Sequence, residues 1–147
     1  MTAPMRRLYT AEPRAMYHAL PPVVADSSAI CALLFEELER DDARQRLQGR
    51  ELHAPALLDF EFASVALKKH RQGLPAPLIE SALAGYRMQP LVLHRVDIAG
   101  QCALAQQYAL SAYDAAYLWL AAELRTTLIT FDRRLGEAAA QHLAGLQ

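Results

Sequence analysis

Residues 20–30 read LPPVVADSSAI, and this stretch decides the fold. The short Val-rich run at 22–26 is typical of a strand buried on both faces, as parallel strands in α/β proteins usually are. The serines that follow can cap a helix that we expect to extend to about Glu39. Asp26 lies where the buried strand ends, and a carboxylate at that point needs partner residues from elsewhere in the sequence.

Strands and helices alternate along the rest of the chain. The segments ELHAP (51–55), PLVLHR (90–95) and TLIT (127–130) are predicted strands. Alternation of this kind predicts an α/β fold with a mostly parallel sheet and helices on both faces. The helices that we expect cover about 40–49, 56–72, 76–87, 97–108, 112–125 and 132–143.

Length and composition limit the class of protein. The chain has 147 residues, 53% of them hydrophobic, which suits one globular domain without a linker or repeats. A formal net charge of −1 excludes a general basic surface of the kind that coats nucleic acid. Cys31 and Cys102 lie in apolar segments without metal-ligand spacing, so we expect reduced core thiols of a cytoplasmic protein.

The first twenty residues differ from the rest of the chain. They contain three arginines but neither helical or strand periodicity nor an apolar run of signal-peptide length. No window approaches the ~20 apolar residues of a membrane span, so we expect no membrane contact. We therefore divide the chain into an N-terminal arm, 1–20, and one domain, 21–147; the arm is either flexible or an extension upstream of a start at Met16.

Two acids directly follow predicted strands. Asp26 follows the first strand and Asp132 follows the last. Sites in open parallel sheets form beyond the carboxyl ends of the strands, most often where the strand order reverses. If the two strands are neighbours, both side chains open into one crevice. Each acid is also a good helix N-cap, so capping stays open as the plainer explanation.

Two more acids lie on helices. Glu61 is at the margin of the apolar stripe of its helix, and Asp59 points to a different side. Asp114 lies within SAYDAAYLWLAA (111–122), where an unpaired charge is costly. The alternatives are a solvated flank residue for Glu61 and, for Asp114, a helix-start acid that accepts from backbone N–H groups.

Four acids from four elements point to one kind of site. Carboxylates packed together raise one another's pKa, so such a cluster is stable mainly with a cation. Hard oxygen ligands without a Cys or His set suit Mg²⁺ or Mn²⁺. Such an ion activates water and neutralises charge that develops on a phosphodiester. The predicted metal-binding and catalytic residues are Asp26, Glu61, Asp114 and Asp132.

The segments that carry these acids resemble a known family. They read VVADSSAICALL (23–34), APALLDFEFASVALKK (54–69), LSAYDAAYLWLA (110–121) and LITFDRRL (128–135). In this order and spacing they are similar to the motifs of a PIN domain, and specifically of a VapC-type toxin ribonuclease from bacterial toxin–antitoxin pairs. The resemblance covers about residues 22–135.

The resemblance implies a three-layer α/β/α PIN fold with four to five strands and a metal-dependent endoribonuclease acting as a toxin. It also implies Thr130 as a supporting hydroxyl, beside which we place Ser27. Proteins of this kind commonly cut tRNA or rRNA, bind a small VapB-type antitoxin that inserts a tail into the active-site groove, and form homodimers. The C-terminal residues 137–147 lack the β-branched run of the family's last strand, so a fifth strand there is either short or absent.

Other polar and aromatic residues are weaker candidates for functional roles than the four acids. Arg133 and Arg134 flank Asp132 and are candidates for contacts with RNA phosphates. The basic end of the helix at 56–72 reads as a solvated face. We expect Tyr113, Tyr117 and Trp119 to be core or dimer contacts rather than base-stacking residues, and we assign no histidine to chemistry.

Rival functions lack their signatures. A receiver domain needs paired acids at the first strand and a late lysine, whereas the only lysines are Lys68 and Lys69. An Asp-x-Asp phosphatase is excluded because position 28 is serine, and no glycine loop for a nucleotide occurs. The remaining alternative is a non-catalytic PIN-like module that binds nucleic acid or a partner protein. The presence of all four acids argues against this alternative, because a site without catalysis has no need for four carboxylates that repel one another.

Overall fold

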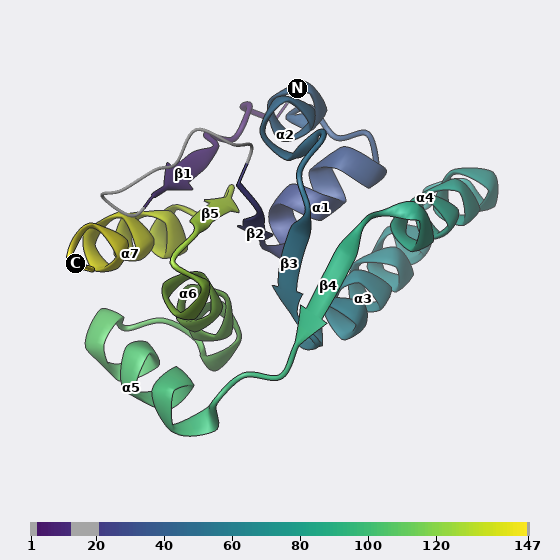
Figure 1. Cartoon of the computed structure of the whole chain (residues 1–147). Helices are drawn as coiled ribbons and strands as arrows, with labels where there is room; N and C mark the ends of the chain where they lie inside the picture. The colour runs from purple at the N-terminus through teal and green to yellow at the C-terminus, as the bar shows by residue number, and fades with distance from the viewer. Residues whose placement is uncertain (1–2, 13–20, 147) are drawn as a thin grey trace.

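A five-stranded sheet forms the centre of the molecule, in the spatial order β1-β5-β2-β3-β4 (Figure 1). The computed structural model describes residues 3–12 and 21–146. The pairs β5–β2, β2–β3 and β3–β4 are parallel, and β1 is antiparallel to β5. The predicted α/β fold with a mostly parallel sheet is therefore confirmed. The strands are β1 (Tyr9–Ala11), β2 (Val23–Ala25), β3 (Leu52–Pro55), β4 (Leu91–His94) and β5 (Thr127–Thr130).

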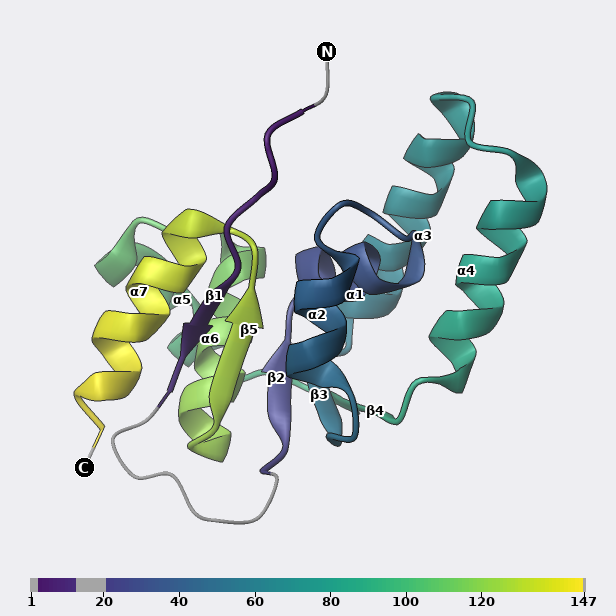
Figure 2. The same ribbon diagram turned by 90° about the horizontal axis from the view of Figure 1, so that it is seen from above.

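Helices cover both faces of the sheet and make three layers. α5, α6 and α7 lie on one side, and α1 and α2 lie on the other (Figure 1). α3 and α4 form an antiparallel hairpin that packs against α1 (Figure 2). The helices in the described part of the chain are α1 (Ser27–Leu34), α2 (Arg40–Leu47), α3 (Leu57–Arg71), α4 (Ala76–Met88), α5 (Ile98–Tyr108), α6 (Ala112–Leu124) and α7 (Arg133–Ala144).

The core lies around the two central strands β2 and β5. Val23, Val24, Leu128 and Ile129 are each at most 2% exposed, because helices cover both faces of these strands. The continuous apolar runs that predicted buried parallel strands therefore have the expected surroundings. α1 is shorter than predicted, because Glu36 adopts a positive φ of 51° just after its end.

The N-terminal segment contains a strand that the sequence does not predict. β1 pairs with β5 in a register that sets Tyr9 opposite Thr130 and Ala11 opposite Leu128. The Tyr9 side chain lies so close to α7 that a Cβ atom at Gly136 would be 2.4 Å from the Cβ of Tyr9. Glycine at that position therefore permits the approach.

Arg6 fastens the same segment to the loop between α1 and α2. Its Nε is 2.9 Å from Oε1 of Glu39, a carboxylate that is only 3% exposed, and it also pairs with Glu37. The Arg6 guanidinium lies over the ring of Phe131, 5.4 Å from the ring centroid. The five-stranded sheet thus includes part of the expected arm, whose residues 13–20 lie outside the described part of the chain.

Two further expectations can be compared with the structure. The doubtful fifth strand does not come from residues 137–147, because α7 extends through Ala144 and β1 occupies the edge beside β5. Cys31 is buried, and burial raises the pKa of its thiol to about 12, whereas Cys102 is exposed on α5, contrary to expectation. Among the described helices, none has the length and apolarity required to cross a membrane.

Candidate active site

Asp26 and Asp132 stand at the ends of two neighbouring parallel strands. β2 and β5 pair with Ala25 opposite Ile129, so the residues that follow them leave the sheet at the same edge. The chain order reverses between these strands, since β2 leads to β3 on one side while β5 lies on the other. This is the position where sites form in open α/β sheets.

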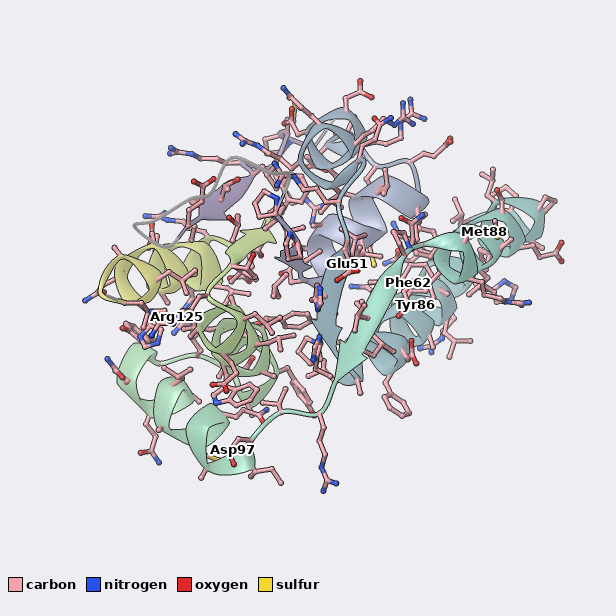
Figure 3. The ribbon with its side chains drawn as sticks, viewed as in Figure 1. Glu51, Phe62, Tyr86, Met88, Asp97 and Arg125 are labelled. Carbon is pink, nitrogen blue, oxygen red and sulfur yellow. The ribbon has the colours of Figure 1, made fainter. Side chains whose placement is uncertain are left out.

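Both acids are also helix N-caps, as the plainer explanation requires. Oδ1 of Asp26 accepts from the backbone N–H of Ala29 at 3.1 Å, and Oδ1 of Asp132 accepts from that of Leu135 at 2.8 Å. Asp97 caps α5 in the same way, through Gly100 at 2.8 Å, but it lies at the outer end of α5 (Figure 3). Capping therefore explains the local geometry but does not distinguish the two acids at the sheet edge from Asp97.

Asp26 is the most enclosed of the four predicted acids. It is 3% exposed, and it accepts from the Ser28 hydroxyl at 2.6 Å and from the Thr130 hydroxyl at 2.5 Å. Burial raises the pKa of Asp26 to about 6, although these hydrogen bonds and the one from Ala29 favour the charged form. The negative charge of Asp114 raises this pKa further.

The two hydroxyls that hold Asp26 also connect the ends of β2 and β5. Thr130 Oγ1 accepts from the backbone N–H of Asp132 at 2.9 Å, and Ser28 Oγ accepts from that of Phe131 at 2.8 Å. Thr130 thus contacts both acids. The predicted supporting residue beside Thr130 was Ser27, but Ser28 has that position and donates to Asp26, whereas Ser27 donates to Glu61 at 3.5 Å.

Glu61 reaches the site from the second turn of α3. Its Oε1 accepts from the hydroxyl of Tyr117 on α6 at 2.6 Å. Burial raises the pKa of Glu61, and so does the charge of Asp114, while the hydrogen bonds from Tyr117 and Ser27 lower it. Tyr117 is buried as expected, but its role in orienting Glu61 was not predicted; the available signal is that a buried tyrosine hydroxyl needs a partner.

Asp59 is directed away from this site. Tyr86 on α4 donates its hydroxyl to Oδ1 of Asp59 at 2.7 Å. The ring of Tyr86 stacks on Phe62 with 4.3 Å between centroids, so this contact belongs to the α3–α4 hairpin (Figure 3). The predicted separation of Asp59 from Glu61 is in agreement with this arrangement.

Asp114 lies in the first turn of α6, at the centre of the electrostatic interactions. The α6 N-cap, Ser111, accepts from the backbone N–H of Asp114 at 3.0 Å. Burial raises the pKa of the half-buried Asp114 carboxyl, and the charge of Asp132 raises it further; Ser111 and the charge of Arg134 oppose this shift. Because Asp114 also acts on Asp26 and Glu61, its charge is coupled to each of the other three acids.

Two arginines follow Asp132 in the first turn of α7. Both are exposed. Arg133 pairs with Glu137 at 2.9 Å, and Arg134 donates to the backbone oxygen of Ala109 and acts on Asp114 through its charge. Arg134 is thus the positive group that is electrostatically coupled to the acids.

The four acids fit a hard divalent cation in donor chemistry and charge. They supply carboxylate oxygens. Burial raises the pKa values of Asp26, Glu61 and Asp114, and the charge of a neighbouring acid raises each of them further. In the described residues, no three Asp, Glu, His or Cys side chains are already gathered around one point as metal ligands. The fit is therefore one of ligand type and electrostatics, without a preformed cage.

A cavity of about 390 Å³ opens beside Glu61. Two of its lining residues are large aromatic side chains that are mostly exposed: Phe60 on α3 at 78% and Tyr113 on α6 at 65%. The other lining residues are Ser27, Glu61, Ser64 and Val65.

Comparison with known proteins places these features in a family. Residues 23–141 match the family model of the PIN domain. The chain is 31% identical over 121 residues to "Ribonuclease VapC3" of Pyrobaculum aerophilum, an alignment that covers 78% of this chain and 92% of that protein. It is 35% identical over 119 residues to "Ribonuclease VapC9" of Mycobacterium tuberculosis and to "VapC ribonuclease Mb0985" of Mycobacterium bovis, with 78% of this chain and 89% of each relative covered.

A solved structure has the same fold. The crystal structure of PAE2754 from Pyrobaculum aerophilum superposes with a TM-score of 0.58 at 20% identity, covering 80% of this chain and 85% of that one. The matched family region contains all four acids and the strands β2 to β5 that position them, whereas β1 lies outside it. The chain therefore belongs to the PIN-domain family and is of the VapC type.

Proposed function

We propose that this protein is a metal-dependent endoribonuclease and the toxin of a toxin–antitoxin pair. The observation that carries the proposal is the coupling of Asp114 to Asp26, Glu61 and Asp132 at one edge of the sheet. Relatives at 31% and 35% identity that are named as VapC ribonucleases support the same conclusion. The four acids would hold Mg²⁺ or Mn²⁺, which, when bound, supplies activation of water and neutralisation of phosphodiester charge.

The chain's own groups orient the acids. The hydroxyls of Ser28 and Thr130 fix both oxygens of Asp26, and the Tyr117 hydroxyl fixes Glu61. These contacts restrict the carboxylate rotamers, so less conformational entropy is lost when a ligand binds. The acids alone repel RNA, and the exposed Arg134 and Arg133 at the start of α7 offer positive charge for the substrate phosphates.

The proposal includes partners that follow from the VapC relationship. We infer a small VapB-type antitoxin as the inhibitor, an RNA substrate that is commonly tRNA or rRNA in this family, a homodimeric state and a cytoplasmic location. The antitoxin, the RNA substrate and the homodimer rest on family membership, and the cytoplasmic location rests on the expected reduced thiols. The proposed role of the acids also rests on geometry.

Asp114→Asn tests the proposal, because Asp114 is the acid whose charge is coupled to the other three. The change removes one negative charge and keeps the side-chain shape, so we expect weaker Mn²⁺ binding by calorimetry and more than about 100-fold slower cleavage of a fluorescent RNA. Asp59→Asn is the matched control, because Asp59 lies on the same helix as Glu61 but contacts Tyr86. Its cleavage and Mn²⁺ binding should equal those of the wild type.

The alternative function, a non-catalytic PIN-like module, predicts a different result. The wild-type protein would then bind RNA or a partner but would cleave no RNA in Mg²⁺ or Mn²⁺. Cleavage by Asp114→Asn at the wild-type rate would instead refute the role of the acids while leaving ribonuclease activity in place.

A further inference from the structure

We propose that the cavity between Phe60 and Tyr113 binds an unpaired nucleobase of the RNA substrate, adjacent to the acids. The inference rests on the proposed ribonuclease function and adds a substrate determinant to it. The cavity lies outside the set of four acids, but Glu61 lines it and so joins the two.

The first argument is the exposure of two aromatic rings at one cavity. Tyr113, which the sequence predicted to be a core or dimer contact, is not in the core. It is 65% exposed and Phe60 is 78% exposed, although Phe62 and Tyr117 on the same helices are 1% exposed. Large rings on the same two helices are thus buried, whereas these two are in solvent. Exposed apolar groups gathered at one place commonly mark an interaction site.

The second argument is the chemistry of the walls. Phe60 comes from α3 and Tyr113 from α6, so the two rings reach the cavity from different elements, and each offers a π face for stacking. Ser27 and Ser64 also line the cavity and add hydroxyls to its walls. A serine hydroxyl both donates and accepts, so it can pair with the polar edge of a base.

The third argument is electrostatic and selects the part of the nucleotide. The charged group on the cavity wall is the carboxylate of Glu61, and no cation lines the cavity among the described residues. A phosphate there would meet an uncompensated negative charge, whereas a neutral base would not. The base therefore has its place against Phe60 and Tyr113, and the phosphate would lie outside the cavity, toward the acids that would hold the metal ion and toward Arg134.

The consequence is a preference for single-stranded RNA. A base within a duplex is already stacked and paired, so it reaches the cavity only after being extruded from the helix, which opposes binding. An unpaired base of a loop or a strand end is free to enter. Stacking on an aromatic side chain tolerates different bases, so the cavity contributes affinity and strand selectivity more than sequence specificity.

The test measures binding and cleavage separately. Phe60→Ala, Tyr113→Ala and the double variant are compared with the wild type on a fluorescein-labelled single-stranded RNA and on the duplex of the same sequence. Binding is measured by anisotropy in the Asp26→Asn background, which prevents cleavage. We expect each single variant to bind the single strand about 10-fold more weakly, while duplex binding stays constant.

Cleavage kinetics provide the second measurement. In the otherwise wild-type protein, Phe60→Ala and Tyr113→Ala should raise KM for the single strand about 10-fold with a smaller change in kcat. Phe60→Tyr and Tyr113→Phe keep a ring and should recover most of the affinity that alanine loses. Met88→Ala is the control, because Met88 is 82% exposed, ends α4 (labelled in Figure 3) and does not line the cavity.

The outcomes distinguish this inference from the proposed function. Cleavage by all variants with a wild-type KM, or an equal loss of single-strand and duplex binding, would overturn the nucleobase site and leave the ribonuclease intact. Alanine variants with unchanged RNA binding but weaker binding of a protein inhibitor would assign the cavity to that protein and also overturn the inference. If the wild type cleaves no RNA in Mg²⁺ or Mn²⁺, the proposed function fails instead.

Discussion

Asp26 and Asp132 have the same local position, between a strand and the helix that follows it, but they differ in their surroundings. Each follows a buried parallel strand and caps the next helix. The Thr130 hydroxyl donates to the Asp26 carboxylate and accepts from the backbone N–H of Asp132. Asp26 is 3% exposed and accepts three hydrogen bonds, whereas Asp132 is exposed and its side chain accepts one. The same motif therefore yields one buried carboxylate and one exposed carboxylate. Both would hold the metal ion, but their contributions to the free energy of unfolding should differ.

The largest expected effect is on RNA cleavage. Asp26→Asn and Asp132→Asn should each slow cleavage more than about 100-fold, because each removes a charge that would hold the metal ion. Asp97→Asn is the control, since it changes the same kind of N-cap on α5 and should cleave at the wild-type rate. Wild-type cleavage by Asp26→Asn would end the metal-site hypothesis.

The next effect is a pH dependence of the free energy of unfolding that Asp26 causes. The folded-state pKa of Asp26 is raised to about 6 from 3.8, so the folded protein holds this proton more tightly than the unfolded chain does. Without metal, this stabilisation is complete below about pH 4 and is lost as pH rises through about 6, a difference of about 3 kcal/mol in unfolding free energy. Urea unfolding between pH 4 and 7.5 measures it.

The same unfolding measurement on the two asparagine variants, and on the wild type with Mg²⁺, tests whether Asp26 is the cause. Asp26→Asn should flatten the part of the pH dependence that Asp26 causes, whereas Asp132→Asn should leave that part in place. Mg²⁺ at 100 times its dissociation constant should restore about 2.7 kcal/mol at pH 7.5, because the ion binds the ionised folded state. A wild-type pH profile in Asp26→Asn would show that other groups, such as Glu61 and Asp114, dominate it.

A smaller effect is expected from the hydroxyl that joins the two acids. Thr130→Val removes a donor to Asp26 and an acceptor for the backbone N–H of Asp132. We expect a loss of about 2 kcal/mol in unfolding free energy and a 10-fold or greater fall in kcat, about the effect of losing an outer-shell partner.

Thr126→Val is a matched control for that variant. Thr126 is also buried at the sheet and donates its hydroxyl, but to the backbone oxygen of Pro22 at the opposite end of the strands. It should cost about 1 kcal/mol of stability without changing kcat. Equal kcat losses in both threonine variants would mean that Thr130 acts through stability alone.

The smallest effect is the loss of a cap. Asp132→Ala and Asp97→Ala should each destabilise the protein by about 1 kcal/mol, since each removes one side-chain bond to a backbone N–H of the following helix. Chemical denaturation of both variants measures it. Only Asp132→Ala should also lose cleavage, and a far larger destabilisation by Asp132→Ala would indicate that its environment resembles that of Asp26.

Much of the fold and the choice of acids can be predicted because local patterns carry them. Apolar runs predict β2 and β5, and an acid after each run marks the shared edge. Three-dimensional contacts were harder to predict. The choice between Ser27 and Ser28 depends on the first turn of α1, and the bond from Tyr117 to Glu61 depends on how α6 packs against α3.

The N-terminal strand was unpredictable for a related reason. β1 has three residues, and a partner strand and a nearby glycine stabilise it more than its own pattern does. Tyr9 and Gly136 are far apart in sequence, and nothing local indicates that they touch. Short edge strands lack the alternation over several residues on which strand prediction depends.

The pairing of β1 with β5 also determines which start residue should be chosen when the protein is produced. A polypeptide begun at Met16 would lack Tyr9–Ala11, and β5 would become an open edge of the sheet, with backbone groups available to another chain. Arg6 would be missing as well, so Glu39 would lose its counter-charge while remaining buried. Such a shortened product should self-associate and precipitate more readily than one that retains its first twelve residues.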